Sequence, residues 1–153
     1  MNAIIRSALP SDAAAASRIA LTAKAHWGYS PAVIASWEPQ LTFAPAYIAA
    51  HTVFIAELDG SAVGVCALEE YGAYRELAHL WVLPSAQGRG LGSALLRRVL
   101  EECAGRPGPL RVESDPNAAA FYARAGGVRI GEIAAAIPTD PARTLPVFEF
   151  VSA

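Results

Sequence analysis

Residues 76–103 read ELAHLWVLPSAQGRGLGSALLRRVLEEC, and this stretch decides the fold because a glycine-rich turn joins a strand to a helix. The apolar strand runs into Pro84, and the segment QGRGLG at 87–92 lies where the turn becomes the helix. Glycine has no Cβ and tolerates positive φ, so the backbone here can approach a ligand closely. The first amides of a helix have no internal acceptor and favour an anion such as phosphate. The stretch therefore predicts an anion-binding cradle.

Two familiar phosphate-binding loops do not fit this spacing. A P-loop ends in Gly-Lys-Ser/Thr, whereas the only lysine of the chain is Lys24, far from the turn. A dinucleotide-binding fingerprint needs G-x-G-x-x-G, and counting from Gly88 puts Ser93 at the last glycine position. The pattern that remains is Q-x-x-G-x-G, directly after a strand ending in L-x-V-x-P.

Composition and charge narrow the class of protein. A chain of 153 residues with 54% hydrophobic content suits a single domain over 1–153 with a substantial core. Twelve basic and fourteen acidic residues give a formal charge of −2, which does not favour a nucleic-acid partner. No apolar run approaches the roughly 18–20 residues that span a bilayer, and the N-terminus lacks a signal peptide's apolar core. We therefore expect no membrane association and a cytoplasmic location.

The two cysteines, Cys66 and Cys103, fall in a predicted strand and on a predicted helix. Buried free thiols are the expected interpretation, in preference to a disulfide or a metal site. The sequence has no CxxC, HExxH or histidine cluster, so it indicates no metal.

Hydrophobic periodicity and turn signals predict an alternating order of elements. The helix that follows the turn carries an apolar stripe at Leu91, Leu95, Val99 and Cys103, and Asp59-Gly60 marks a hairpin turn. Strands are expected at 3–7, 52–58, 62–69, 76–83, 110–113, 128–133 and 145–150. Helices are expected at 12–25, 30–37, 41–49, 91–103 and 117–125. This order predicts an α+β fold with a mixed sheet of six to seven strands and helices on both faces.

The glycine turn resembles the pyrophosphate-binding turn of the GCN5-related N-acetyltransferase (GNAT) superfamily, and the order of elements is also that of the GNAT fold. A second segment, DPNAAAFYARAGG at 115–127, resembles the family's Asn, aromatic-Tyr and Gly positions. The resemblance implies acetyl-CoA as co-substrate, with pantetheine between two splayed strands. Its implied contacts are Leu80, Trp81 and Val82 on the strand, and Gln87, Gly88, Arg89, Gly90, Leu91, Gly92 and Ser93 in the turn. The cofactor-arm contact falls on Asn117, although the usual spacing would place it at Asp115.

Amide formation from a thioester and an amine needs a neutral amine, a stabilised oxyanion and a proton for the leaving thiolate. The resemblance places the acid at Tyr122, whose hydroxyl is protonated at neutral pH, and implies a carboxylate base at Glu76. Strand alternation puts Glu76 and His79 on opposite faces, although a β-bulge, usual in this strand of the family, would reverse that parity. His79, Glu113 and a water relay remain alternative bases.

The segment AHWGYSPAVIASW at 25–37 matches the part of GNAT enzymes that covers the acceptor site. It supplies His26, Trp27 and Tyr29 as expected substrate contacts. The sequence shows no acidic cluster typical of a polyamine pocket, so the acceptor amine, of a small molecule or a peptide, stays unnamed. We expect direct attack in a ternary complex, because neither cysteine lies beside a histidine in a nucleophile pattern. A non-catalytic acyl-CoA-binding module, a longer acyl donor and a homodimer remain open.

Overall fold

The computed structural model describes residues 2–151, and its centre is a seven-stranded sheet with the order β1-β2-β3-β4-β5-β7-β6. Neighbouring strands are antiparallel except β4 and β5, which are parallel. The strands are β1 (Ala3–Ser7), β2 (Thr52–Leu58), β3 (Ser61–Glu70), β4 (Arg75–Val82), β5 (Leu110–Glu113), β6 (Val128–Ala134) and β7 (Thr144–Phe150). This mixed sheet confirms the predicted α+β class.

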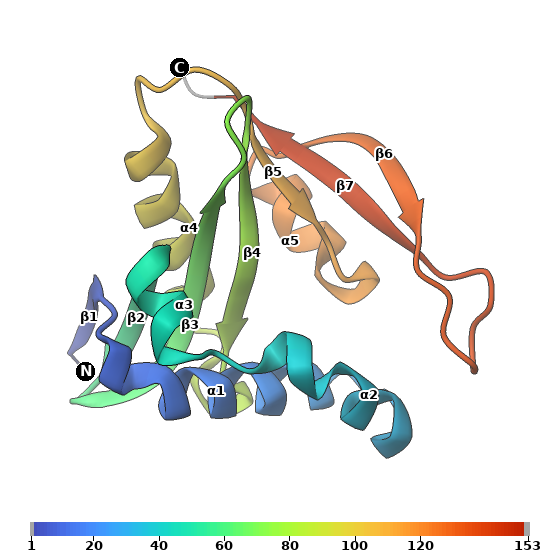
Figure 1. Cartoon of the computed structure of the whole chain (residues 1–153), viewed down its shortest axis with the longest axis horizontal. Coiled ribbons are helices and arrows are strands. Elements are labelled where there is room, and N and C mark those ends of the chain that lie inside the picture. The colour runs from blue at the N-terminus through green and yellow to red at the C-terminus, as the bar shows by residue number, and fades with distance from the viewer. Residues whose placement is uncertain (1, 152–153) are drawn as a thin grey trace.

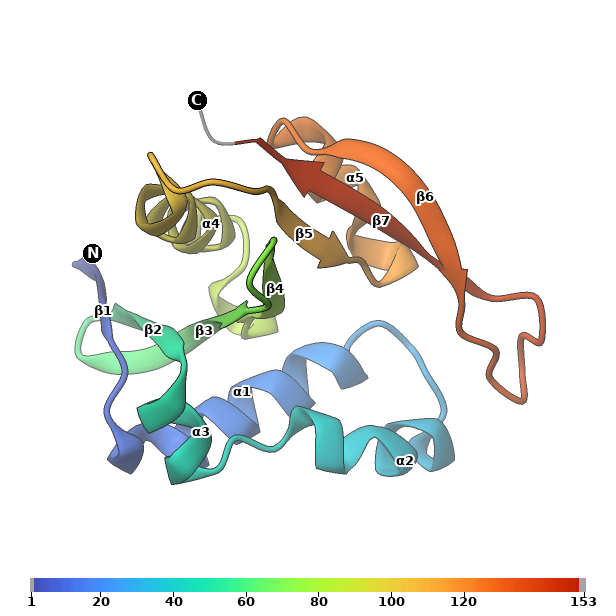
Figure 2. The ribbon, with the colours of Figure 1, turned by 45° about the horizontal axis from the view of Figure 1, so that its top comes forward.

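Helices cover both faces of the sheet, as predicted. Figures 1 and 2 show α1, α2 and α3 on one face, and α4 and α5 on the other. The helices are α1 (Ala13–Ala25), α2 (Pro31–Leu41), α3 (Pro45–Ala50), α4 (Leu91–Cys103) and α5 (Ala119–Arg124). Within residues 2–151, none of these helices combines the length and the apolar character needed to cross a membrane.

The boundaries of α2, α3 and α5 differ from the prediction by two residues or more, and α3 begins at Pro45 rather than at residue 41. Helix α2 continues past the predicted end at residue 37 to Leu41, even though Pro39 lies inside it. Leu41 is buried among the side chains of α1 and α3, and this packing favours the extra turn. Helix α5 is shorter than predicted, because Pro116–Ala118 forms a separate 3₁₀ turn before it.

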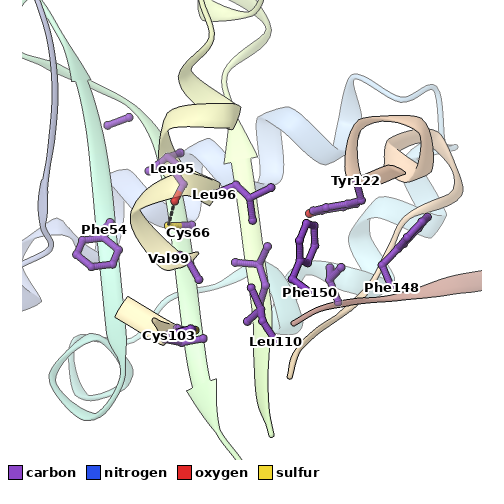
Figure 3. Packing of buried hydrophobic residues seen from close by; sticks show 14 residues of the cluster. Phe54, Cys66, Leu95, Leu96, Val99, Cys103, Leu110, Tyr122, Phe148 and Phe150 are labelled. Atoms are coloured by element: carbon purple, nitrogen blue, oxygen red, sulfur yellow. Dashed lines mark hydrogen bonds between the residues drawn. The ribbon is translucent and has the colours of Figure 1, made fainter. Parts of the chain in front are cut away.

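The core between the sheet and α4 follows the predicted stripe. Leu91, Leu95, Val99 and Cys103 are all buried, and Figure 3 shows three of them packed against the sheet. Both cysteine thiols are buried and free. Burying these side chains stabilises α4 against the sheet, at about 25 cal/mol per Å² of apolar surface. The start of α4, where the glycine turn lies, is thereby held against the end of β4.

Strands β4 and β5 pair over only two positions before they separate. Arg75 pairs with Leu110 and Glu76 with Arg111, and β5 then continues alongside β7. The ends of β4 and β5 therefore diverge and leave an opening in the middle of the sheet, as the family resemblance implied.

A β-bulge interrupts β4 just beyond those paired positions. The register shifts between Ala67 and Leu68 of β3, whose partners are His79 and Leu77. Ala78 is therefore an extra residue, and the residues after it alternate in the opposite phase to the residues before it.

Candidate active site

A cleft of about 520 Å³ opens where β4 and β5 diverge. Its walls come from the two strands, from the glycine turn and from α5. The lining residues that bear on the predictions are Trp27, Leu80, Trp81, Val82, Gln87, Gly88, Gly90, Leu91, Gly92, Ser93, Glu113, Asp115, Asn117, Tyr122 and Arg124. The cleft therefore runs from the turn, past the end of β4, to the end of α1.

The glycine turn has the backbone conformation expected of the predicted cradle. Gly88 and Gly90 have φ of +79° and +75°, a conformation that side chains with a Cβ rarely adopt. Gly90 is the N-cap of α4 and has no side chain that could cap the amides of the first turn. The Gln87 side-chain amide donates to the Val82 carbonyl at 3.5 Å and ties the turn to β4. These amides lie beside the cleft, where the helix dipole favours a phosphate group.

We expect the substitution Gly90→Val to abolish the thermal stabilisation that acetyl-CoA gives the wild-type chain. A β-branched residue at φ +75° is strained, so the turn has to change shape and misdirect its amides. The measurement is the melting temperature with and without acetyl-CoA. Gly60→Val is the matched control, because Gly60 has φ +84° in the β2–β3 turn, where an added Cβ meets no atom. If Gly90→Val responds to acetyl-CoA like wild type, the turn is not the phosphate site.

Tyr122 lies on α5 with its ring between the core and the cleft. The residue is 6% exposed, its ring contacts Phe121 edge-on, and Figure 3 shows the hydroxyl pointing away from α5 toward β4. No other group within residues 2–151 forms a hydrogen bond with this hydroxyl. Burial raises the pKa of Tyr122 above its ordinary value, so the hydroxyl stays protonated at neutral pH. It is therefore a proton donor without an internal partner at the wall of the cleft.

The bulge shows that the sequence-based assignment of Glu76 and His79 to opposite faces was wrong. Both residues, with Trp81, lie on the sheet face that carries α1, because the extra residue Ala78 shifts the alternation. His79 is packed against Phe43, with ring centroids 4.5 Å apart, and its Nδ1 accepts a hydrogen bond from the Trp81 indole at 3.0 Å. Burial lowers the pKa of His79 to about 4, so the ring is neutral and weakly basic.

Glu76 lies near other acidic side chains. Burial raises the pKa of its carboxyl group, and the nearby carboxylates of Glu113 and Glu69 raise it further. The sequence separates these three glutamates, and the fold places them close enough to interact. Glu113 lines the cleft. Glu76 does not line it, although Leu77, the next residue in the chain, does.

A buried ion cluster closes the end of the cleft beside α1. The Asp115 carboxylate accepts hydrogen bonds from the Lys24 ammonium and, at 2.8 Å, from the Tyr29 hydroxyl. Arg143 donates to the Tyr29 hydroxyl at 3.1 Å. The side chains of Lys24, Asp115 and Arg143 are 11%, 7% and 7% exposed. The cluster therefore joins α1, the end of β5 and the β6–β7 loop.

Charged side chains in this cluster interact with one another and with the nearby aromatic rings. Burial lowers the pKa of Lys24, whose ammonium lies 4.6 Å from the ring centroid of Trp37. Burial alone would raise the pKa of Asp115, but the hydrogen bond and the charge of Lys24 hold it below its ordinary value. Asn117 also donates to Asp115, at 2.9 Å. Both Asp115 and Asn117 line the cleft, and the Asp115 carboxylate is engaged by its own chain.

The structure brings most of the predicted contacts together and leaves four outside the cleft lining. The predicted residues that do not line it are Arg89, Glu76, His26 and Tyr29. His26 is exposed at the C-terminal end of α1, and Tyr29 is held in the ion cluster. Arg124, which was not predicted from the sequence, lines the cleft two residues after Tyr122 and could pair with a phosphate. The roles of Lys24 and Arg143 in the ion cluster were not predicted either. The one signal that the sequence offered was that Lys24 is its only lysine.

The comparisons with known proteins agree with this geometry. A family model described as an acetyltransferase (GNAT) domain matches residues 49–126, just over half of the chain. The chain belongs to the GNAT family of acetyltransferases. The match runs from β2 to the end of α5 and so includes the cradle, the divergent strands and Tyr122. No curated protein matches this GNAT chain significantly.

Solved structures of other GNAT proteins share the fold over nearly the whole chain. A GCN5-related N-acetyltransferase from Rhodopseudomonas palustris is 24% identical, with a TM-score of 0.78, over 97% of this chain and 95% of that one. The paia N-acetyltransferase from Thermoplasma acidophilum, in complex with coenzyme A, is 17% identical, with a TM-score of 0.78, over 97% of this chain and 98% of that one. The ribosomal-protein-S18-alanine N-acetyltransferase from Escherichia coli is 19% identical, with a TM-score of 0.75, over 99% of this chain and 96% of that one. At these identities the likeness shows a common fold.

Proposed function

We propose that this GNAT chain transfers the acetyl group of acetyl-CoA to a primary amine by direct attack in a ternary complex. The observation that carries the proposal is the continuous cleft between β4 and β5, with the cradle at one end and the Tyr122 hydroxyl in its wall. The N-acetyltransferase from Thermoplasma acidophilum was solved in complex with coenzyme A, which supports an acyl-CoA donor for this chain.

The cradle and its neighbours would hold the donor. The α4 amides behind Gly90 face the pyrophosphate, and Arg124 adds a positive charge at the same wall. Backbone groups of Leu80 to Val82, left unpaired by β5, are available to the pantetheine arm. A backbone amide near Trp81 or Val82 would stabilise the oxyanion.

Proton transfer is divided between two side chains. Glu76, directly or through water, takes a proton from the acceptor ammonium, and the resulting amine attacks the thioester carbonyl. The C–N bond forms, the C–S bond breaks, and Tyr122 gives its proton to the leaving thiolate. An acyl-enzyme is not required. Neither cysteine lines the cleft, and burial raises the pKa of the Cys66 thiol to about 12.

Release of the CoA thiol from acetyl-CoA, measured with a panel of primary amines, tests the proposed function. Cys66 and Cys103 are both buried, so the native chain contributes little thiol background. Amine-dependent release supports the proposal. If the chain binds acetyl-CoA but releases no CoA with any amine, it is a non-catalytic module. If CoA is released only from longer acyl-CoA thioesters, the donor is a different acyl-CoA.

We expect Glu76→Gln to lower turnover and to remove the acid-side limb of the profile of kcat/KM against pH. The raised pKa of the Glu76 carboxyl places this limb above pH 4.3, the ordinary value for glutamate, with activity falling as the base is protonated. The measurement uses one acceptor throughout, so that the titration of the acceptor amine stays constant.

His79→Asn and Glu113→Gln are the comparison variants for this profile. His79 has a pKa of about 4 and a ring nitrogen occupied by Trp81, so its replacement should leave the limb in place. Loss of the limb in Glu113→Gln alone would transfer the role of base to Glu113. If the acid-side limb is kept in both Glu76→Gln and Glu113→Gln, a water relay is favoured as the base.

A further inference from the structure

Lys24, the only lysine of the chain, lies beside the cleft at the C-terminal end of α1, the helix that Figure 1 shows passing below the end of β4. Ala23, directly before it, and Trp27 both line the cleft. So does Asp115, which accepts a hydrogen bond from the Lys24 ammonium. The ammonium also lies 5.7 Å from the ring centroid of Trp81, another lining residue. The cleft therefore has a primary amine of the chain itself beside its wall.

The charges of the ion cluster are unequal, with two positive side chains, Lys24 and Arg143, against one negative side chain, Asp115. The Nε of Arg143 is buried and has no hydrogen-bond partner within residues 2–151. Burial and the charge of Arg143 lower the pKa of Lys24, although the hydrogen bond to Asp115 raises it. A neutral group in place of the Lys24 ammonium would leave Asp115 and Arg143, 3.5 Å apart, as one balanced pair. The surroundings of Lys24 therefore favour the loss of its charge.

We infer that Lys24 is a modification site, to which the chain transfers the acetyl group of its own bound acetyl-CoA. The inference rests on the proposed function, because it uses the same donor, the same cradle and the same acid. Donor and amine are held in one molecule, so the reaction gains from a high effective concentration of the amine. The product is a stable amide, so the reaction stops after a single acetyl group per chain.

The Lys24 side chain can reach the donor because its ammonium is carried on a flexible four-carbon stem. Rotation about these bonds moves Nζ from Asp115 toward Trp81 and the backbone amides expected to stabilise the oxyanion. Asp115 keeps its hydrogen bonds from Tyr29 and Arg143 during this movement. The rest of the ion cluster therefore stays joined while the amine moves.

The protons and bonds of this transfer balance without a further reactant. The Asp115 carboxylate, already hydrogen-bonded to the ammonium, takes one proton from Lys24, and the neutral amine attacks the thioester carbonyl. The C–N bond forms, the C–S bond breaks, and Tyr122 gives its proton to the leaving thiolate. A second proton, lost from the new amide nitrogen, restores the Tyr122 hydroxyl, and Asp115 returns its proton to water.

Mass spectrometry of the full chain after incubation with acetyl-CoA, with no amine added, tests the inference. We expect wild type to gain the mass of one acetyl group, and fragmentation to place this group on Lys24 rather than on the α-amino group. One CoA thiol should be released per chain. The rate constant should not change with the concentration of the chain, because the transfer takes place within one molecule.

Three controls separate this transfer from chemical acetylation by acetyl-CoA. Lys24→Arg keeps the positive charge and has no nucleophilic amine, so it should gain no acetyl group at residue 24. Tyr122→Phe should acetylate Lys24 roughly 10²–10⁴-fold more slowly than wild type, as expected for the loss of the general acid. Wild type unfolded in urea should react on the order of 100-fold more slowly, because the donor is no longer positioned beside the amine.

An unmodified Lys24 in a chain that releases CoA with an added amine would overturn the inference and leave the proposed function standing. Acetylation at equal rates in the folded and the unfolded chain would show a chemical reaction and also contradict the inference. So would a rate constant that rises with the concentration of the chain, because one molecule would then modify another. A chain that binds acetyl-CoA, releases no CoA with any amine and leaves Lys24 unmodified would overturn the proposed function and this inference together.

Discussion

Replacing Tyr122 with phenylalanine should lower kcat by roughly 10²–10⁴-fold while the affinity for acetyl-CoA is nearly unchanged. The hydroxyl lies at the cleft wall, and burial raises the pKa of Tyr122, so it carries a proton at neutral pH. Removing the hydroxyl leaves the thiolate to depart unprotonated or to rely on water. The measurement is steady-state release of CoA with the best amine found.

The same substitution should leave the fold intact, and this makes the result interpretable. Tyr122→Phe leaves no other group of the described chain without a hydrogen-bond partner, and the ring keeps its contacts with Phe121 and Phe148. Tyr74→Phe, an identical chemical change outside the cleft lining, is the control and should be near wild type in turnover. Unchanged turnover in Tyr122→Phe would reduce Tyr122 to a core residue.

Asp115→Asn should lower the free energy of unfolding by about 3–5 kcal/mol, because it removes a carboxylate that contacts two buried cations, Lys24 and Arg143. Lys24 and Arg143 would then face each other without a counter-ion. Urea denaturation measures the loss, and the melting temperature should fall on the order of 10 °C. Lys24→Met should cost less, since Asp115 keeps Arg143 and Tyr29 as partners. Equal losses in the two variants would show that the carboxylate does not hold the cluster.

The effect of Asp115 on stability should also depend on pH in one direction. The pKa of Asp115 is lowered in the folded chain, so its contribution is complete above the unfolded value, near 3.9, and is lost as pH falls through the lowered pKa. The stabilities of wild type and Asp115→Asn should therefore converge in acid. A difference that persists at the lowest pH at which both remain folded would contradict this account.

The features that the sequence predicted correctly are local ones. Asp59 and Gly60 both adopt positive φ in the β2–β3 turn, as their residue types indicated. The four-residue apolar stripe identified α4 and its buried face, and the alternate glycines identified a turn with positive φ at its start. Each of these depends on a backbone conformation or a periodicity set within a few residues, which is why one sequence suffices to predict it.

The boundaries and the facing of residues in the site were harder to predict. The extra residue at Ala78 in β4, which brings Glu76 and His79 onto one face, depends on how β4 pairs with β3. No residue type in HLWV or its neighbours marks that position. The engagement of Asp115 by its own chain likewise depends on a partner, Lys24, that lies 91 residues away along the chain.

The sequence by itself determined the fold class, the glycine turn before α4 and the place of Tyr122 on α5, because glycine conformation, helical periodicity and motif spacing are local properties. Only the tertiary structure decided the rest: the bulge that forms where β4 pairs with β3, and the joining of Lys24, Asp115 and Arg143. These features arise when distant segments pack together and buried charges require partners, whatever their separation in sequence.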